Sequence, residues 1–413
     1  MNWFSTLSTA DRLADAVKET GDRVRAAFAE VGFPDLVLAF VSPHYAGLQS
    51  AGLNSAGAHA AGRDIGKEIA ADILAWTGAR ALIGCTGGGV IGGGVEIEGR
   101  PALSLTAARL GGVQVQTFHL SDADLPGGDD APSAWHAALG VPGELAPQFI
   151  LLPDPYSMRV DALLAGLDYA YPQSTKIGGL ASGARGAGGH LLFRDDQCYS
   201  EGVVGVALSG RVALDAIVAQ GCRPRGVDHR ITKCRGNALL ELDGKPAVEV
   251  FEEFYRELSE SEQLLAQRHQ LFLGLASSAF LEKPDQGDFL IRNLIGVDAK
   301  SGALLIGAEL RNGMTVRFHL RDAASSREDL AEALRAYRER RPSDAALQGA
   351  LLFSCLGRGQ GLYGVPDHDS RAFADSLAPV PLGGFFCNGE IGPVGDRTHV
   401  HGFTSSFGVF RAP

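Results

Sequence analysis

Hydrophobic and polar positions follow the same order in three stretches of the chain. In each stretch an apolar run typical of a buried strand precedes a segment with helical spacing, a second apolar run, a glycine-rich corner and alternating strands. The paired apolar runs are at 35–41 and 81–91, 149–152 and 176–183, and 349–355 and 381–387. This order predicts an α/β fold, with two associated domains of mixed β-sheets and flanking helices, built from a repeated strand-helix-strand-hairpin unit.

Helices and further strands of this pattern follow from the spacing of apolar residues. Amphipathic helices are predicted within 10–31, around 65–76 and around 160–167, and hairpin strands at 95–105 and 113–120. If the three stretches are equivalent, the corners at Cys85, Ser182 and Asn388 should lie at equivalent places in the fold.

A region of different character separates the second and third stretches. Residues 247–258 and 259–275 are predicted to be helical, and the second helix opens with a Ser-x-x-Glu capping box at Ser259 and Glu262. A strand meander with an Asn-Gly turn follows over 289–322, and a helix from Ser326 leads back to the third stretch. A domain boundary is therefore expected near residues 225–235.

Composition and charge narrow the classes of function. The 413 residues are 45% hydrophobic and 21% charged, as in ordinary globular proteins, and the net charge is -11. An acidic chain whose longest basic cluster is 338–341 would repel nucleic acid and anionic membranes, so neither is expected as a partner. With no apolar run near the ~20 residues of a membrane span and no signal-peptide pattern at the start, we expect a cytoplasmic protein with reduced cysteines.

Phosphate-loop and metal signatures are absent from the sequence. Glycines 84–92 match neither the P-loop nor the dinucleotide fingerprint, and strand rather than helix follows them. The histidines and cysteines offer no helical i, i+4 ligand pair, so no metal site is predicted. His399 and His401 share one face of a predicted strand. We predict no cofactor, with haem bound through a single histidine as the alternative.

Polar side chains gather in the third stretch where its apolar runs end. Parallel α/β sheets usually bind ligands at such strand ends. The candidate ligand-binding residues there are Cys355, Arg358, Asn388, Glu390 and His401, joined by Cys85, Thr86 and Ser182 at the corresponding ends of the other two stretches.

These residue types suit a small zwitterion or carboxylate. Arg358, flanked by glycines, can bind a carboxylate in a bidentate manner, or it can form an internal pair with Glu390. If it anchors a ligand, Arg358→Ala should abolish ligand binding without unfolding the chain. Two alternatives stay open: a thiol hydrolase built from Cys355, His401 and Asn388, and a reactive but non-catalytic Cys355 thiol.

The motifs around these residues resemble those of FIST-domain proteins. The resemblance rests on Leu-Leu-Phe-Ser-Cys355-Leu-Gly-Arg-Gly, Gly-Phe-Phe-Cys387-Asn-Gly-Glu-Ile-Gly-Pro and Leu-Ile-Gly84-Cys-Thr-Gly-Gly, and extends from about residue 36 to 410. It implies an N-terminal helix at 1–34, a FIST N domain at 35–226 and a FIST C domain at 227–413.

The family implies a role in sensing small ligands, for which amino acids have been proposed. Some bacterial members are linked to haem and nitric oxide, and the family offers no agreed catalytic set. The sequence is therefore expected to be a sensor that binds an amino acid or small carboxylate without turnover, with a signalling protein as a further candidate partner. A haem-based gas sensor and a cysteine-dependent hydrolase or transferase are the alternatives.

Overall fold

The computed structural model describes residues 1–45, 56–278, 284, 286–298, 300–341 and 346–413, with the side chains of 56–61 left aside. Contacts divide the chain into two compact units. The first comprises Met1–Val218, Ala333–Val400 and Thr404–Pro413, and the second comprises Ala219–Glu332 and His401–Phe403. The second unit thus interrupts the first, whereas the division at 34 and 226 that the sequence predicts is linear and stays a prediction.

In the described part of the first unit the strands form three six-stranded sheets, each around a central pair of parallel strands. The first sheet has the order β1 (Asn2–Ser8), β6 (Leu103–Arg109), β2 (Leu36–Val41), β3 (Leu82–Thr86), β10 (Leu192–Arg194), β11 (Gln197–Tyr199). The second runs β7 (Val113–Leu120), β12 (Val203–Gly210), β8 (Gln148–Pro153), β9 (Lys176–Gly179), β23 (Glu390–Val394), β24 (Arg397–His401). The third runs β13 (Ala213–Ala219), β25 (Ser405–Arg411), β21 (Leu347–Cys355), β22 (Leu382–Cys387), β4 (Gly89–Gly92), β5 (Val95–Glu98).

The last two strands of each sheet come from a different stretch of the chain than the parallel strands at its centre. The hairpin β4–β5 follows β3 in sequence but pairs with β22, while β10–β11 follows β9 and pairs with β3. The hairpin β23–β24 follows β22 and extends the sheet of β9. The exchange links all three sheets in a cycle. The repeated unit that the sequence predicts stays a prediction, although the strand orders of the three sheets correspond.

One glycine in each parallel pair sets a common register. Gly84, Gly178 and Gly384 lie opposite Ala39, Leu151 and Leu352, and a Cβ on any of them would lie 1.9–2.0 Å from the facing carbonyl oxygen. Four residues further on stand Gly88, Ser182 and Asn388. The expectation that Cys85 is equivalent to Ser182 and Asn388 is therefore wrong by three residues, because Cys85 is still inside β3 and Gly88 takes the equivalent position.

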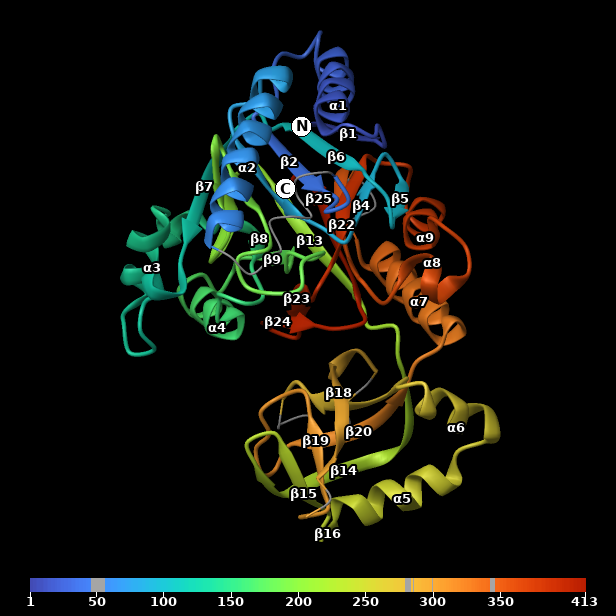
Figure 1. The fold of residues 1–413 in the computed structure, drawn as a ribbon. Coiled ribbons are helices and arrows are strands. Elements are labelled where there is room, and N and C mark those ends of the chain that lie inside the picture. Colours follow the sequence, from blue (N-terminus) through green and yellow to red (C-terminus); the bar gives the residue numbers. More distant parts are fainter. Residues whose placement is uncertain (46–55, 279–283, 285, 299, 342–345) are drawn as a thin grey trace. The chain divides into compact units, whose positions relative to one another are not determined.

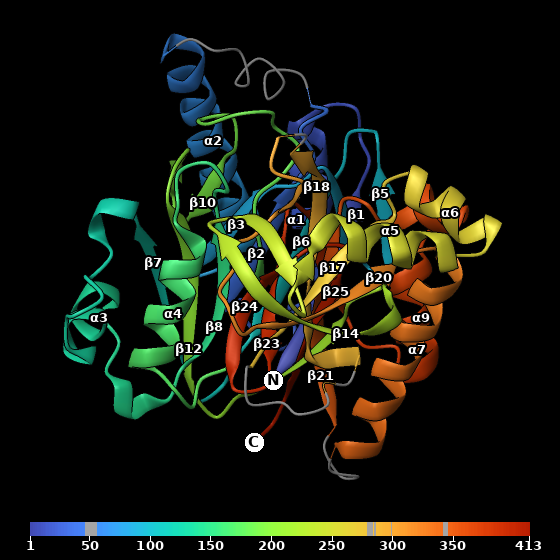
Figure 2. The same cartoon turned by 90° about the horizontal axis from the view of Figure 1, so that it is seen from below.

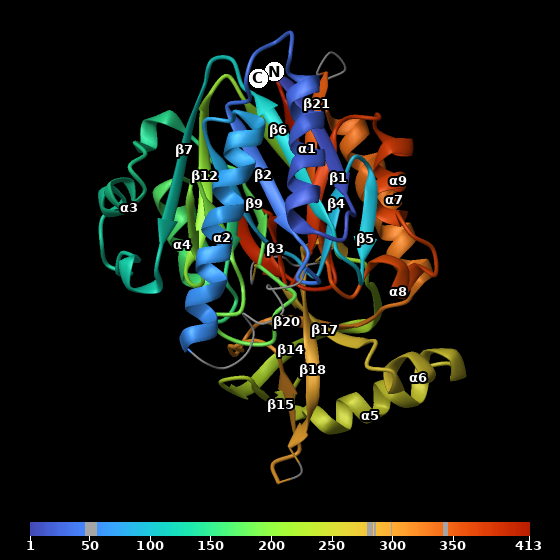
Figure 3. The ribbon, with the colours of Figure 1, turned by 45° about the horizontal axis from the view of Figure 1, so that its top comes forward.

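Helices cover the outer faces of these sheets. Figure 3 shows α1 and α2 side by side across β2 and β6. It also shows α3 and α4 on the opposite side of the unit from α8 and α9, and Figure 2 shows the same for α9. The helices are α1 (Leu13–Ala27), α2 (Ala56–Thr77), α3 (Pro132–Leu139), α4 (Val160–Ala170), α7 (Ala323–Arg340), α8 (Gly359–Tyr363) and α9 (His368–Ser376), with short 3-10 turns at Asp122–Asp124 and Gly143–Leu145.

The three sheets share one apolar core. Phe385 of β22 stacks on Phe40 of β2 with ring centroids 4.7 Å apart and meets Phe353 of β21 edge-on at 5.8 Å. Ile150 of β8 belongs to the same buried cluster. Because each sheet contributes one face to this core, the predicted mixed α/β architecture with flanking helices is confirmed.

Two predictions for the first unit need correction. Residues 2–8, which the resemblance assigns to an N-terminal helix at 1–34, form β1 and pair with β6 along their whole length. Both faces of β1 are partly covered, so its sequence lacks the polar alternation that marks a strand. The single strand predicted at 95–105 is two strands, β5 and β6, because Gly99 adopts a left-handed φ of +68° between them.

The second unit, drawn in yellow-green to orange in Figure 1, is an antiparallel barrel. Its strands follow the order β14 (Arg223–Arg235), β20 (Thr315–Leu320), β17 (Leu271–Ala276), β18 (Phe289–Asp298), β19 (Ala303–Ile306), β15 (Ala238–Leu242) and β16 (Lys245–Pro246), and a pairing of β14 with β15 closes it. Two helices, α5 (Ala247–Glu257) and α6 (Glu260–Gln267), and a 3-10 turn at Gln286–Asp288 complete the unit.

The helix predicted at 259–275 is only half right. Its capping box at Ser259 and Glu262 is confirmed, but the helix ends at Gln267. His269 then takes a left-handed φ of +58°, and the chain continues as strand β17. The apolar run 271–276 is buried on both faces, so its pattern fits a strand and a buried helix equally well.

Candidate functional site

Backbone hydrogen bonds hold the three glycine-rich corners together at the carboxyl ends of the parallel strands. The N–H of Ser182 donates to the carbonyl of Thr86 at 3.1 Å, and the N–H of Asn388 donates to that of Leu180 at 3.0 Å. The Ser182 Oγ accepts from the N–H of Gly88 at 2.8 Å and donates to the carbonyl of Phe386. Ser182 is thus a structural link in the corner.

Cys85 and Thr86 lie deeper in the fold than the sequence suggests. Cys85 has no exposed surface, and burial raises its pKa well above the ordinary value. The Thr86 Oγ1 accepts the N–H of Leu191 at 3.2 Å. Both side chains belong to the interior around β3, so ligand contact through them would need the corner to open.

The structure brings Cys355, Asn388, Glu390 and Ser182 to the same end of the sheets. Cys355 is half-buried, Asn388 is exposed, and Glu390 is fully buried. Glu390 accepts from the Cys387 Sγ at 3.3 Å and from the N–H of Thr404 at 3.0 Å. His401 is buried and belongs to the second compact unit. A ligand-binding role for these residues stays a hypothesis.

Arg358 is buried, and it forms an ion pair with Asp369. Its Nε lies 2.8 Å from one Asp369 oxygen and an Nη lies 3.2 Å from the other, while the same Nη contacts the Tyr363 hydroxyl. The side chains of the pair are 0% and 2% exposed. Burial alone would raise the pKa of Asp369, but the Arg358 charge and the hydrogen bond from His368 lower it. This geometry favours a structural role for Arg358 over ligand contact.

A second buried carboxylate, Glu96 of β5, lies beside this pair. One of its oxygens accepts both the N–H and the Oγ–H of Ser370 at 2.8 Å. Burial, followed by the negative charge of Asp369, raises the pKa of Glu96 to about 7. Glu96 of the third sheet and Asp369 of α9 are therefore neighbouring carboxyl groups whose pKa values are shifted in opposite directions.

This raised pKa predicts a pH dependence of stability. The pKa of Glu96 rises from 4.5, its ordinary value, to about 7 in the fold, so between these pH values the folded chain binds more protons than the unfolded chain. The contribution of Glu96 to stability is therefore fully present below about pH 4.5 and is lost as the pH rises to 7. We expect Glu96→Gln to raise the free energy of unfolding at pH 8 relative to wild type, by up to about 3 kcal/mol. Urea denaturation of both proteins from pH 5 to 8 measures the difference, and equal pH dependence in both would contradict the assignment.

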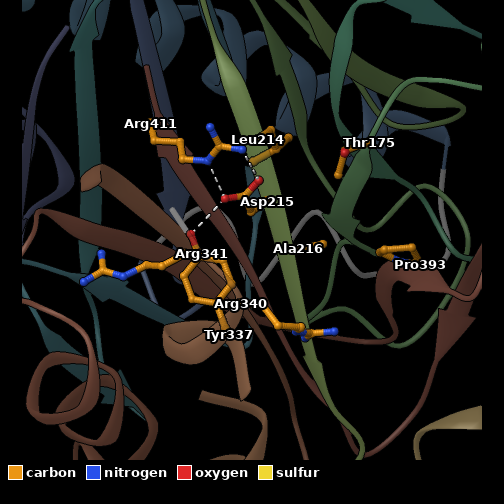
Figure 4. A pocket seen from close by; sticks show the side chains of 9 residues that line it. All are labelled: Thr175, Leu214, Asp215, Ala216, Tyr337, Arg340, Arg341, Pro393 and Arg411. Carbon is orange, nitrogen blue, oxygen red and sulfur yellow. Dashed lines mark hydrogen bonds and ion pairs between the residues drawn. The ribbon is translucent and has the colours of Figure 1, made fainter. Parts of the chain in front are cut away.

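A solvent-accessible pocket lies at the opposite end of the sheets in the first unit, where the parallel strands begin (Figure 4). Its volume is about 360 Å³. It is lined from β13, α7 and the residue after it, β23, β25 and the residue before β9, by Thr175, Leu214, Asp215, Ala216, Tyr337, Arg340, Arg341, Pro393 and Arg411.

Positive charge dominates this pocket. Asp215 forms a bidentate pair with Arg411, at 2.7 and 3.1 Å, and accepts the Tyr337 hydroxyl at 2.9 Å. Burial and then the Asp215 charge raise the pKa of Tyr337, so the phenol stays protonated. Arg340 and Arg341 make no ion pair within the described ranges. The Asp215–Arg411 pair thus forms one wall of the pocket. The guanidinium groups of Arg340 and Arg341 add positive charge that suits an anion.

Sequence reasoning missed this pocket. Arg340 and Arg341 belong to the basic cluster 338–341, a pattern typical of the solvated end of a helix. Arg411 lies far away in sequence, near the end of the chain. Asp215 and Arg411 are 196 residues apart. The one available signal was a local basic cluster in an acidic chain.

Another pair that the sequence did not indicate lies at the carboxyl end of β8. The Nδ1 of His190 lies 2.7 Å from Asp154, both side chains are fully buried, and the His190 Nε2 accepts the N–H of Ala184 at 3.2 Å. Asp154 also accepts the Ser157 hydroxyl at 2.6 Å. These side chains satisfy one another, which is typical of a structural pair.

Two further observations concern ligands and membranes. In the part of the chain that the structure describes, no group of three or more His, Cys, Asp or Glu side chains is placed to hold a metal ion. Among the described helices, none has the length and apolar character needed to cross a bilayer.

Comparison with known families gives two matches that together span most of the chain. The model of the FIST N domain matches residues 35–245, and the model of the FIST C domain matches residues 247–393. The second match crosses from the barrel into the first unit, so these sequence domains and the compact units differ.

Similar proteins include two uncharacterized proteins of Mycobacterium tuberculosis. One is 38% identical over 345 residues, which cover 83% of this chain and 87% of the relative. The other is 35% identical over 347 residues, covering 84% and 87%. An F-box/LRR-repeat protein of Arabidopsis thaliana is 29% identical over 114 residues, which cover 27% of this chain and 21% of that protein.

Proposed function

Because the chain belongs to the FIST family, whose domains are sensory domains implicated in signal transduction, we propose that it senses a small carboxylate or amino acid without turnover. The observation that carries the proposal is the arginine-lined pocket of Figure 4.

The size of the pocket favours a small ligand. About 360 Å³ is at the lower end of the range of small-molecule sites. Leu214, Ala216 and Pro393 provide an apolar wall, and Arg340 and Arg341 supply charged donors. Such a combination binds a short apolar group together with a carboxylate.

The charges in the pocket favour an anion. The lining contains three guanidinium groups and one carboxylate, and that carboxylate is already paired with Arg411. A guanidinium binds a carboxylate through two parallel hydrogen bonds, which adds orientation to the charge attraction. The Asp215 carboxylate and the Tyr337 phenol are hydrogen-bonded to each other, and Asp215 is also paired with Arg411, which supports binding without turnover.

The prediction is that carboxylates stabilise the protein through this pocket. Thermal denaturation would be followed with amino acids, monocarboxylates and dicarboxylates, with inorganic phosphate and chloride as anion controls. Arg341→Ala should weaken binding of the stabilising carboxylate by about 10-fold or more, because a hydrogen bond to a charged group is lost. Arg338→Ala is the matched control, since Arg338 lies in the last turn of α7, three residues before Arg341, but outside the pocket.

The same assay tests the carboxyl-end hypothesis through Asn388→Ala, which alters an exposed side chain. A shift lost in Asn388→Ala and kept in Arg341→Ala would move the site to the glycine-rich corner. Stabilisation by phosphate equal to that by every carboxylate would contradict the ligand class. If no carboxylate stabilises the wild type, the proposal fails.

A further inference from the structure

Two cysteines stand opposite each other where β21 and β22 end. The parallel register pairs Cys355 with Cys387. Neighbouring strands lie about 4.8 Å apart, which is within the Cα separation of roughly 4.4–6.8 Å that disulfides span. Side chains of paired residues in a parallel ladder project from the same face of the sheet. All six cysteines, which lie in the described ranges, are thiols, so this pair is reduced.

The environments of the two thiols differ. Cys355 is half-buried, whereas Cys387 is fully buried. The Cys387 Sγ lies 3.3 Å from a Glu390 oxygen and 3.4 Å from the carbonyl of Ser354. Burial first, and then the charges of Glu390 and Cys355, raise the pKa of Cys387. A small oxidant from solvent therefore reaches Cys355 before Cys387. Cys387 remains a protonated thiol beside the Glu390 carboxylate.

We propose that Cys355 and Cys387 form a peroxide-oxidisable dithiol, a modification site independent of the arginine-lined pocket. The Cys355 sulfur attacks hydrogen peroxide, the O–O bond breaks, and sulfenic acid and one water result. The Cys387 sulfur then attacks the Cys355 sulfur, the S–O bond breaks, and a second water leaves. In sum, two thiols lose two electrons and two protons to one peroxide molecule.

Glu390 has a defined role in the second step. Its carboxylate oxygen is close enough to accept the Cys387 proton as the sulfur attacks, and thiolates are the attacking species in thiol exchange. Its other oxygen stays bound to the N–H of Thr404, the residue before β25. Disulfide formation removes the thiol partner of Glu390, so oxidation alters the hydrogen bonding at this end of the third sheet.

The test uses the full chain treated with hydrogen peroxide, followed by alkylation, intact mass measurement and peptide mapping. We expect a loss of about 2 Da, two fewer alkylated cysteines, a cross-linked peptide containing Cys355 and Cys387, and reversal by dithiothreitol. Cys387→Ser should abolish the cross-link and leave Cys355 as sulfenic acid, which dimedone traps. Cys234→Ser is the control, because Cys234 is the other half-buried cysteine and lies in the barrel.

Other outcomes would overturn the proposal. Cys355 that stays fully alkylatable after peroxide treatment would show that the thiol is inert. Sulfinic acid at Cys355 formed at the same rate in wild type and Cys387→Ser would show that Cys387 does not resolve the sulfenic acid. A cross-link to any other cysteine would place the dithiol elsewhere.

Discussion

Arg358→Ala is expected to lower the free energy of unfolding by about 3–5 kcal/mol, because it leaves the buried Asp369 carboxylate without its counter-charge. The two side chains are 0% and 2% exposed, so solvent can neither screen the pair nor hydrate the remaining charge. Ser354, His368 and Ser405 would still bond Asp369, but these donors replace only part of the guanidinium's contribution. This expectation reverses the one drawn from the sequence, in which the same variant loses a ligand and stays folded.

Urea denaturation of the wild type and variants measures the effect. Arg371→Ala is the matched control, because Arg371 pairs with Asp367 at 3.1 Å on the same helix but is 65% exposed, and an exposed pair contributes about 1 kcal/mol or less. The double variant Arg358→Met with Asp369→Asn should be more stable than Arg358→Ala, since no unpaired charge remains. A loss below 1 kcal/mol in Arg358→Ala would remove the argument for a structural role.

Gly384→Ala is expected to destabilise the chain by more than about 3 kcal/mol or to prevent folding, because overpacking against backbone is relieved only by moving a strand. A Cβ at this position would lie 1.9 Å from the carbonyl oxygen of Leu352 and 2.8 Å from its carbon. The carbonyl belongs to the adjacent parallel strand at the centre of the third sheet, so it cannot shift alone. Gly384 also has a φ of +149°, which L side chains rarely adopt.

Gly361→Ala provides the comparison for this prediction. Gly361 lies in α8, a Cβ there would meet nothing within 4 Å, and alanine favours helix over glycine by roughly 1 kcal/mol. We expect this variant to match or exceed wild-type stability. Soluble expression and thermal denaturation of both variants give the readout. A Gly384→Ala protein as stable as wild type would mean that the facing strands separate easily, contrary to the close packing around Phe353 and Phe385.

Local pattern was enough to predict most individual elements. The apolar runs at 35–41, 149–152 and 349–355 are strands, and the capping box at Ser259 starts α6. These features depend on residues a few positions apart, so a single sequence contains the information. Prediction failed where local signals are ambiguous, as at 271–276, whose buried apolar run fits two secondary structures.

The polar residues at the strand ends were only partly interpretable from the sequence. Their gathering at one end of the sheets follows from strand direction, which the helical crossovers indicate. Their partners do not. Arg358 pairs with Asp369 rather than presenting its charge to solvent. The Ser182 hydroxyl hydrogen-bonds to the backbone of the other two corners. Burial and pairing depend on which elements pack together.

The amino-acid sequence by itself determined most strands and helices, the glycine corners and the family of this protein, because each depends on a pattern of neighbouring residues. Only the tertiary structure decided that hairpins cross between sheets, that a barrel interrupts the first unit, and that Asp215 meets Arg411 across 196 residues. Many pairings between apolar strands have similar local free energies. The packing of the three sheets around one shared core determines which of these pairings forms. The arginine-lined pocket exists only after that selection, since its lining comes from elements that no local pattern connects.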